Sequence, residues 1–469
     1  MIRSIGFGVL ALALVAGCSG SDGSNGKDGE NGTPGENGAP GENGSFDGTA
    51  SVSGVFPGSA FLGGSVEVTL SGFATAWDDT TTLSFGDGVT VSNIRVASPT
   101  ALIATIDVAS SATMGLRDVS VSTGETALTY AQGFKIGSPI AVEAQGDVAQ
   151  GSIFLATIRN LNPAVPFDAT STGDGLFSPI EFTNVSVSAP AGVVVQVNNV
   201  TPTSVDVAVL VDGDMAVGAV ALEVLSGPSG AEVSFPNPMA LDLAARTPKA
   251  LTANADTDFT LAKAFGSEYV TLSVPAGLHI VDLSATSGTG APALAMLGAS
   301  QSFQDLLGVS PTFVGAGDGG TWYGVLWDNS GESAVDATVN YAAIAATSFA
   351  EGASNGDKGS ATALTTPAVV QGASLSGDLD SDWFAVTVAA GDVGKRFSVV
   401  TFAGSPRTDT LITIYDPTDA EFAVSDDDGY HDKLLSDPIT AAGTYYVVIA
   451  ASDFGLGADR NYDAAIYLK

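Results

Sequence analysis

The sequence has little cysteine and little positive charge. Its one cysteine is Cys18, so no disulfide can form within the chain, and stability must come from packing. Lys and Arg number 16 against 51 Asp and Glu, which gives a net charge of -35. Because binding to phosphate groups needs clustered Lys and Arg, we expect no nucleic acid partner. An acidic surface of this kind suits solubility or the binding of cations.

Histidine is equally scarce, with His279 and His431 alone. His279 lies in an alternating apolar segment, 278–283, and is expected to be an ordinary strand residue; His431 follows an acidic run and is expected in a loop. The sequence also lacks the Gly-x-Ser-x-Gly, His-Glu-x-x-His and phosphate-loop motifs of common enzyme classes. We therefore expect no enzyme. The alternative is a secreted or surface hydrolase with an unrecognised active site in residues 137–346, working with His279 or with carboxylates alone.

Long hydrophobic runs are absent except at the N-terminus, where Arg3 precedes an apolar stretch at 5–17 and then Cys18. This stretch is too short for a spanning helix and predicts a signal peptide over residues 1–17. Its end, Val-Ala-Gly-Cys, resembles the lipobox of bacterial lipoproteins. That resemblance implies cleavage before Cys18, acylation of the cysteine with palmitate-like chains, and attachment to the membrane through this lipid anchor. Ser19 replaces the aspartate that retains enterobacterial lipoproteins in the inner membrane, which points to the outer membrane and the cell surface.

Residues 18–48 then form a predicted tether. Glycine recurs at every third position from Gly20 to Gly44, which is the period of collagen, in which only glycine fits at the helix axis. Two interpretations stay open: a flexible or polyproline-like disordered spacer, or a trimeric collagen-like stalk. In both, the segment separates the folded domains from the lipid.

From residue 49 onward the pattern is all-β. Short β-branched runs with period-two alternation are separated by Gly, Asp, Ser and Pro turns, and no amphipathic pattern of helical length appears. An internal repeat divides the first half: Gly115 is matched by Gly218, 103 residues later, and the same spacing relates other turn residues. We therefore predict two domains of one type, at 49–136 and 137–246.

The first of these domains resembles the IPT/TIG immunoglobulin-like domains. In that family such domains act as spacers, adhesion modules or interaction modules and carry no catalytic centre. The second copy lacks part of the pattern and is assigned through the internal repeat. The residues that carry the resemblance are Phe56-Pro57-Gly58, Gly64-Ser65-Val66, Ser71-Gly72-Phe73, Phe85-Gly86, Gly88-Val89-Thr90-Val91 and Ser98-Pro99-Thr100.

The second half repeats a different unit. Residues 268–277 align without a gap with 382–391, which predicts two further β-sandwiches at 247–346 and 347–469. The last one resembles the bacterial pre-peptidase C-terminal (PPC) domain, a small jelly-roll-like sandwich, and the earlier copy is a degenerate form of it. In secreted enzymes, domains of this family accompany a catalytic domain and assist secretion or substrate attachment. The matching residues include Asp378-Leu379-Asp380-Ser381-Asp382-Trp383-Phe384, Asp409-Thr410-Leu411 and Asp426-Asp427.

Acidic residues in this last unit are candidate calcium ligands. Asp380 and Asp382 alternate in an extended segment, and Asp426 and Asp427 lie in a later loop. Calcium takes six to eight oxygen ligands, which carboxylates from separate loops can supply. The alternative, which needs no cofactor, is that these carboxylates accept hydrogen bonds from turn amides. The fold class predicted overall is all-β: tandem β-sandwiches, two Ig-like and two jelly-roll-like, after a lipidated tether. The expected function is non-catalytic binding, adhesion or envelope assembly, with polysaccharide or protein as the partner.

Overall fold

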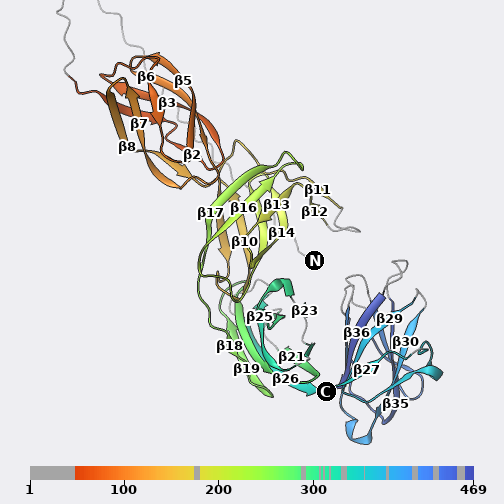
Figure 1. Cartoon of the computed structure of the whole chain (residues 1–469). Coiled ribbons are helices and arrows are strands. Elements are labelled where there is room, and N and C mark those ends of the chain that lie inside the picture. The colour runs from red at the N-terminus through yellow and green to blue at the C-terminus, as the bar shows by residue number, and fades with distance from the viewer. Residues whose placement is uncertain are drawn as a thin grey trace, which may run out of the picture. The chain divides into compact units, whose positions relative to one another are not determined.

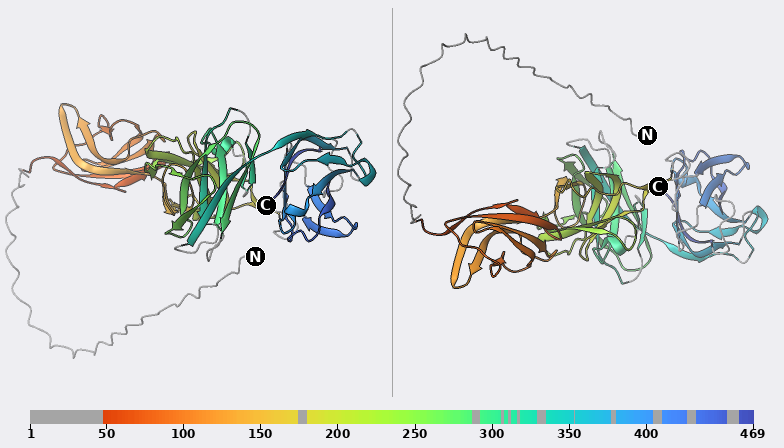
Figure 2. Two further views of the ribbon diagram at one scale, coloured as in Figure 1. Left: turned by 90° about the horizontal axis from the view of Figure 1, so that it is seen from below. Right: turned by 90° about the horizontal axis from the view of Figure 1, so that it is seen from above.

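The computed structural model confirms the predicted all-β class. The residues that it describes form strands and three short 3-10 helices, without any α-helix, and none of their helices is long and apolar enough to cross a membrane. Almost all of the described residues belong to one unit, Ala50–Lys469. This unit is a series of β-sandwiches, which Figures 1 and 2 show as separate groups of strands. The described residues are 48–173, 180–286, 292–305, 308–309, 312–315, 318–328, 335–352, 354–376, 380–403, 410–425, 432–451 and 460–469.

The first sandwich places one sheet, in the order β1-β3-β6-β5, against a second, in the order β2-β8-β7-β4. Without the short edge strand β2, four strands face three, as in an immunoglobulin domain. Alternate residues of each strand enter the core, where Phe85 meets Phe134 edge to face with ring centroids 4.9 Å apart. The strands are β1 (Ser51–Phe56), β2 (Ser59–Phe61), β3 (Ser65–Phe73), β4 (Thr82–Ser84), β5 (Val89–Ser98), β6 (Ala101–Val108), β7 (Gly115–Thr123) and β8 (Thr126–Gly137).

The second sandwich repeats this strand order, with β14-β15-β10-β9 facing β13-β16-β17. Gly115 begins β7 and Gly218 begins the corresponding strand β16, and both have positive φ, +124° and +107°. Glycine adopts this conformation without the steric cost of a Cβ, which explains why both copies keep it. The strands are β9 (Ile140–Gln145), β10 (Ser152–Asn160), β11 (Ser171–Thr172), β12 (Glu181–Phe182), β13 (Val185–Ser188), β14 (Val193–Thr201), β15 (Ser204–Val211), β16 (Gly218–Ser226) and β17 (Val233–Leu243).

The third sandwich has a different order, with the sheet β18-β20-β25-β22-β23 facing β19-β26-β21-β24. Its first strand pairs parallel with β20, and the remaining pairs are antiparallel. The elements are β18 (Lys249–Ala250), β19 (Ala255–Leu261), β20 (Ser267–Val274), β21 (His279–Thr286), β22 (Pro292–Gly298), η1 (Phe303–Asp305), β23 (Gly308–Val309), β24 (Thr312–Gly315), β25 (Gly320–Asp328) and β26 (Val335–Ala345).

The fourth sandwich has the same order as the third, with β28-β30-β35-β32-β33 facing β29-β36-β31-β34 and an added edge strand, β27. Strands β20 and β30, which hold the aligned segments 268–277 and 382–391, occupy the same place in their sheets. The elements are β27 (Thr347–Ala350), η2 (Lys358–Ser360), β28 (Thr362–Leu364), β29 (Ala368–Leu375), β30 (Ser381–Val388), η3 (Ala390–Asp392), β31 (Phe397–Ala403), β32 (Thr410–Tyr415), β33 (Glu421–Ser425), β34 (Lys433–Leu435), β35 (Gly443–Ala451) and β36 (Arg460–Leu468).

Candidate functional site

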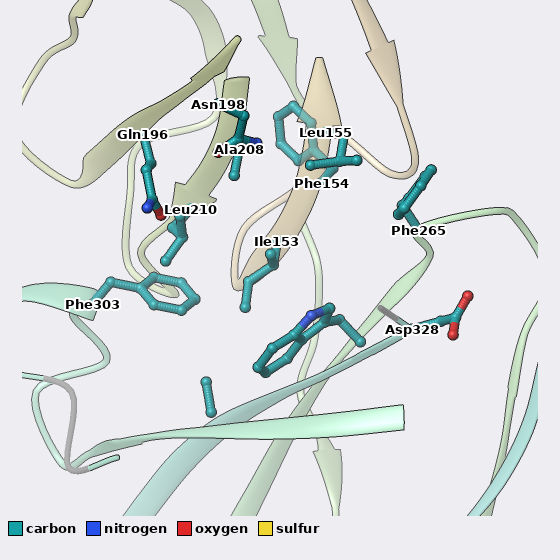
Figure 3. A pocket seen from close by; sticks show the side chains of 12 residues that line it. Ile153, Phe154, Leu155, Gln196, Asn198, Ala208, Leu210, Phe265, Phe303 and Asp328 are labelled. Atoms are coloured by element: carbon teal, nitrogen blue, oxygen red, sulfur yellow. The ribbon is translucent and has the colours of Figure 1, made fainter. Parts of the chain in front are cut away.

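A cavity of about 300 Å³ lies between the second and third sandwiches. Figure 3 shows Ile153 at its centre, Phe303 on one side, and the amide side chains of Gln196 and Asn198 nearby. Apolar side chains dominate the lining, so the cavity suits an apolar group with a hydrogen-bonding edge. The lining residues are Ile153, Phe154, Leu155, Gln196, Asn198, Ala208, Leu210, Phe265, Ala295, Phe303, Trp327 and Asp328.

Tyr269 is the aromatic anchor of this interface. Its ring is buried and stacks on Tyr323, with centroids 5.7 Å apart, and belongs to an apolar cluster that includes Ile153 and Leu210 of the second sandwich. Two glycines of the second sandwich make room for it. A Cβ at Gly213 would lie 1.9 Å from the Tyr269 hydroxyl oxygen, and one at Gly151 would lie 2.4 Å from the ring. Any side chain at either position would overlap Tyr269, so both positions need glycine. We call Gly151 and Gly213 the glycine seat of Tyr269.

Polar contacts accompany the ring. The Tyr269 hydroxyl donates to Gln301 Oε1 at 2.6 Å, and burial raises the pKa of this phenol above its usual value. Across the interface, the Gly213 amide donates to the Gln301 carbonyl at 2.9 Å, and the Phe303 amide donates to Asp212 Oδ1 at 2.8 Å. The sequence pattern does not mark this anchor, although Tyr269 aligns with Trp383 of the last unit.

Gly213→Ala is expected to weaken the docking of the second sandwich on the third. The new methyl group collides with the Tyr269 hydroxyl, and overpacking of this kind costs about 1–3 kcal/mol. Chemical denaturation of the full chain measures the change in the free energy of unfolding. Gly320→Ala is the matched control, because a Cβ there meets no atom within 4 Å. Equal stabilities of the two variants would contradict the close packing of Tyr269 against Gly213.

His279 is the first residue of β21, where it pairs with Gly315 and Ala345. Its Nδ1 atom is buried, and in the part of the chain that the structure describes no hydrogen-bond partner reaches it. Through Nδ1 the ring is therefore not joined to a hydroxyl or carboxylate there, as a general base would be. His431 lies outside the described residues.

The two described calcium candidates have different environments. Asp380 lies before β30, where its Oδ2 accepts hydrogen bonds from the Ser376 amide at 2.6 Å and from the Ser376 hydroxyl at 2.7 Å. These bonds lower the pKa of Asp380 although burial opposes them. Asp380 thus has the alternative role allowed by the sequence, in which the carboxylate accepts a hydrogen bond from a turn amide.

Asp382 is instead buried inside the fourth sandwich, with 1% of its surface exposed. Its Oδ2 accepts a hydrogen bond from the Tyr462 hydroxyl at 2.6 Å. Burial raises the pKa of Asp382 to about 7, and the neighbouring carboxylates Glu351 and Asp380 add to the rise, while the bond from Tyr462 opposes it. Near neutral pH this carboxyl is therefore divided between its charged and neutral forms.

In calcium-free solution the protein is expected to lose stability as pH rises from about 4 to 8. The unfolded chain ionises Asp382 near 3.8 and the folded chain near 7, so the folded form binds more protons between these values. The stabilisation is complete below the lower value and is lost through the upper one, a change of up to about 4 kcal/mol. Asp382→Asn should remove most of this loss of stability, seen as a smaller fall of the melting temperature between pH 4 and 8. Asp437→Asn, at an exposed position, should keep the full dependence, and an unchanged dependence in Asp382→Asn would contradict the assignment.

The other predicted site residues are not described. Cys18, Asp426 and Asp427 lie outside the described residues, as does most of the tether. Within the described ranges, no group of three or more His, Cys, Asp or Glu side chains is arranged to hold a metal ion. Calcium binding in the last unit therefore stays a prediction.

If calcium binds through Asp427, the full chain should melt at a higher temperature with calcium than with a chelator. Ligand at a hundred times its dissociation constant stabilises a fold by about 2.7 kcal/mol. Calorimetry should show this shift for the parent chain and a smaller one for Asp427→Ala. Glu268→Gln, at the matching position to Asp382 in the third sandwich, should leave the shift unchanged. Melting that is the same in calcium and in chelator would leave these aspartates as turn residues.

Comparisons with known proteins give no family for this chain. No protein-family model matches it, and no curated protein matches it. Among solved structures, the Escherichia coli adhesin FdeC aligns with 14% identity over 63% of this chain and 96% of that chain, at a TM-score of 0.16. Domains 5-6 of the S-layer protein SbsC align with 11% identity over 42% of this chain and 100% of that chain, at 0.14. The I9-I11 tandem of titin aligns with 8% identity over 61% of this chain and 94% of that chain, at a TM-score of 0.17. Likenesses at these TM-scores carry no argument about function.

Proposed function

We propose that this chain is a lipid-anchored, non-catalytic binding protein of the bacterial cell envelope, which displays its β-sandwiches from the outer membrane. The observation that carries the proposal is the position of the only cysteine, Cys18, directly after a signal-like apolar run. Acyl chains on this residue would hold the protein to the bilayer, at about 0.8 kcal/mol per buried CH₂ group. The glycine-rich segment that follows would keep the folded part away from the lipid.

The sandwiches support the binding half of the proposal. The second and third sandwiches pack together where Tyr269 fits against Gly151 and Gly213, and the cavity beside this contact is lined chiefly by aliphatic and aromatic groups. Such a lining can hold a ligand, but it brings no nucleophile together with a base. The hydrolase alternative in 137–346 has no comparable observation in its favour, because among the described residues Nδ1 of His279 meets no hydrogen-bond partner.

Replacing the cysteine tests the anchor. In cells that make the parent chain, the protein should sediment with outer membranes and be cleaved by protease added to intact cells. Cys18→Ser should be released or remain unprocessed, because no thiol is left to acylate. Ser24→Ala, in the tether, should behave as the parent chain does. An unmodified mature N-terminus at another residue, found by mass spectrometry, would contradict the proposal.

A further inference from the structure

Three aromatic rings gather on the outward side of the sheet β28-β30-β35-β32-β33. They are Trp383 of β30, Tyr415 of β32 and Tyr446 of β35, and we call them the ring face. Their strand neighbours, such as Phe384, point the opposite way into the core. Trp383 and Tyr415 are stacked, with centroids 5.6 Å apart and planes 6° apart, and Tyr446 meets Trp383 edge to face at 6.2 Å. We infer that the ring face binds uncharged polysaccharide.

The third sandwich has a surface that corresponds to the ring face of the fourth. Trp383 and Tyr446 correspond to Tyr269 and Tyr323 of the third sandwich, which lie at the matching places on β20 and β25. There Tyr269 is covered by the second sandwich and keeps 1% of its surface exposed, whereas Tyr323 is partly exposed. In the fourth sandwich the three rings are partly exposed, and within the described residues their aromatic and cationic neighbours all belong to that sandwich.

The chemistry around the rings differs between the two copies. On the covered face, Tyr323 pairs with Gly298, and Val325 pairs with Ala295. At the corresponding places of the ring face, Tyr446 pairs with Tyr415, and Val448 pairs with Thr413. The glycine of the covered face is thus replaced by a further ring, that of Tyr415, and the alanine by Thr413, which is itself buried. A surface of flat rings with polar edges suits a hydrated ligand.

The rings are held in place before any ligand arrives. The indole Nε1 of Trp383 donates to Ser381 Oγ at 3.1 Å. The ammonium group of Lys358 lies 4.7 Å from the Tyr446 ring centroid and pairs with Asp419. Fixed rings lose little conformational entropy on binding, which favours affinity for a weakly interacting ligand.

Sugar rings match this surface, because each has C–H groups that pack on an aromatic face and hydroxyl groups at its edge. The net charge of -35 disfavours acidic glycans, so the expected ligand is uncharged. This inference rests on the proposed function and names the ligand class of one surface. A protein ligand is the competing outcome of the test below.

The test is affinity electrophoresis of the full chain, purified in detergent, in gels containing dextran, laminarin or mannan, with alginate as the acidic comparison. At least one uncharged polymer should retard the parent chain. Trp383→Ala and Tyr415→Ala should raise the dissociation constant about tenfold, since truncated aromatic anchors at binding surfaces commonly cost this much. Trp383→Tyr introduces the residue found at the aligned position of the third sandwich and should keep most of the binding. Comparison with Trp383→Ala then separates the loss of an aromatic ring from the loss of the fold. Leu435→Ala, at an exposed position on the opposite sheet, should bind as the parent chain does.

Three results would overturn the inference: no retardation by any uncharged polymer, retardation by alginate alone, or equal retardation of the parent chain and Trp383→Ala. A protein partner would replace the glycan under one further result. The parent chain would then bind no glycan, and on intact cells it would crosslink to a protein to which Trp383→Ala does not crosslink. The assay does not depend on membrane attachment, so its failure leaves the fractionation of Cys18→Ser to judge the proposed function separately.

Discussion

The fold depends on one constraint: each sandwich must bury the inward face of two sheets without the help of disulfides. Alternation with period two sends every second side chain inward, and the two sheets meet through those side chains. In the first sandwich Val68 and Ile106 are fully buried in this way, and in the fourth so are Phe384 and Ile466. The outward faces remain for contacts with other sandwiches or with ligands.

The chain contains two sandwich topologies, and each of them occurs twice. The outward faces of the two copies differ in what they contact. In the third sandwich the outward ring of Tyr269 is covered by the second sandwich, and the glycines at 151 and 213 fit around it. Its stacking partner Tyr323 is partly exposed. The opposite sheets of the third and fourth sandwiches meet through a smaller apolar cluster, which includes Ile280 and Tyr467, and through an ion pair of Lys469 with Asp282 at 3.0 Å. The third and fourth sandwiches therefore share a strand order, and a few outward side chains determine what each surface contacts.

The two described aspartates of the last unit show why sequence pattern alone could not settle the candidate site. Asp380 and Asp382 are two residues apart, a spacing that in an extended segment predicts both side chains on one side. Asp380 precedes the strand and binds the turn at Ser376, whereas Asp382 faces the core and meets the Tyr462 hydroxyl. Tyr462 is 80 residues away in sequence. Its contact, and the raised pKa of Asp382, arise only when β30 and β36 close the same sandwich.

The sequence by itself determined the all-β class, the two internal repeats and the strand-starting glycines Gly115 and Gly218, because alternation and turn conformation are local properties of the chain. It also contains the aromatic alignment of Tyr269 with Trp383. Only the tertiary structure decided that the first ring is buried in a glycine seat and that the second remains partly exposed. The physical reason is that burial depends on which other sheet lies against a strand, and residues far apart in sequence make that choice.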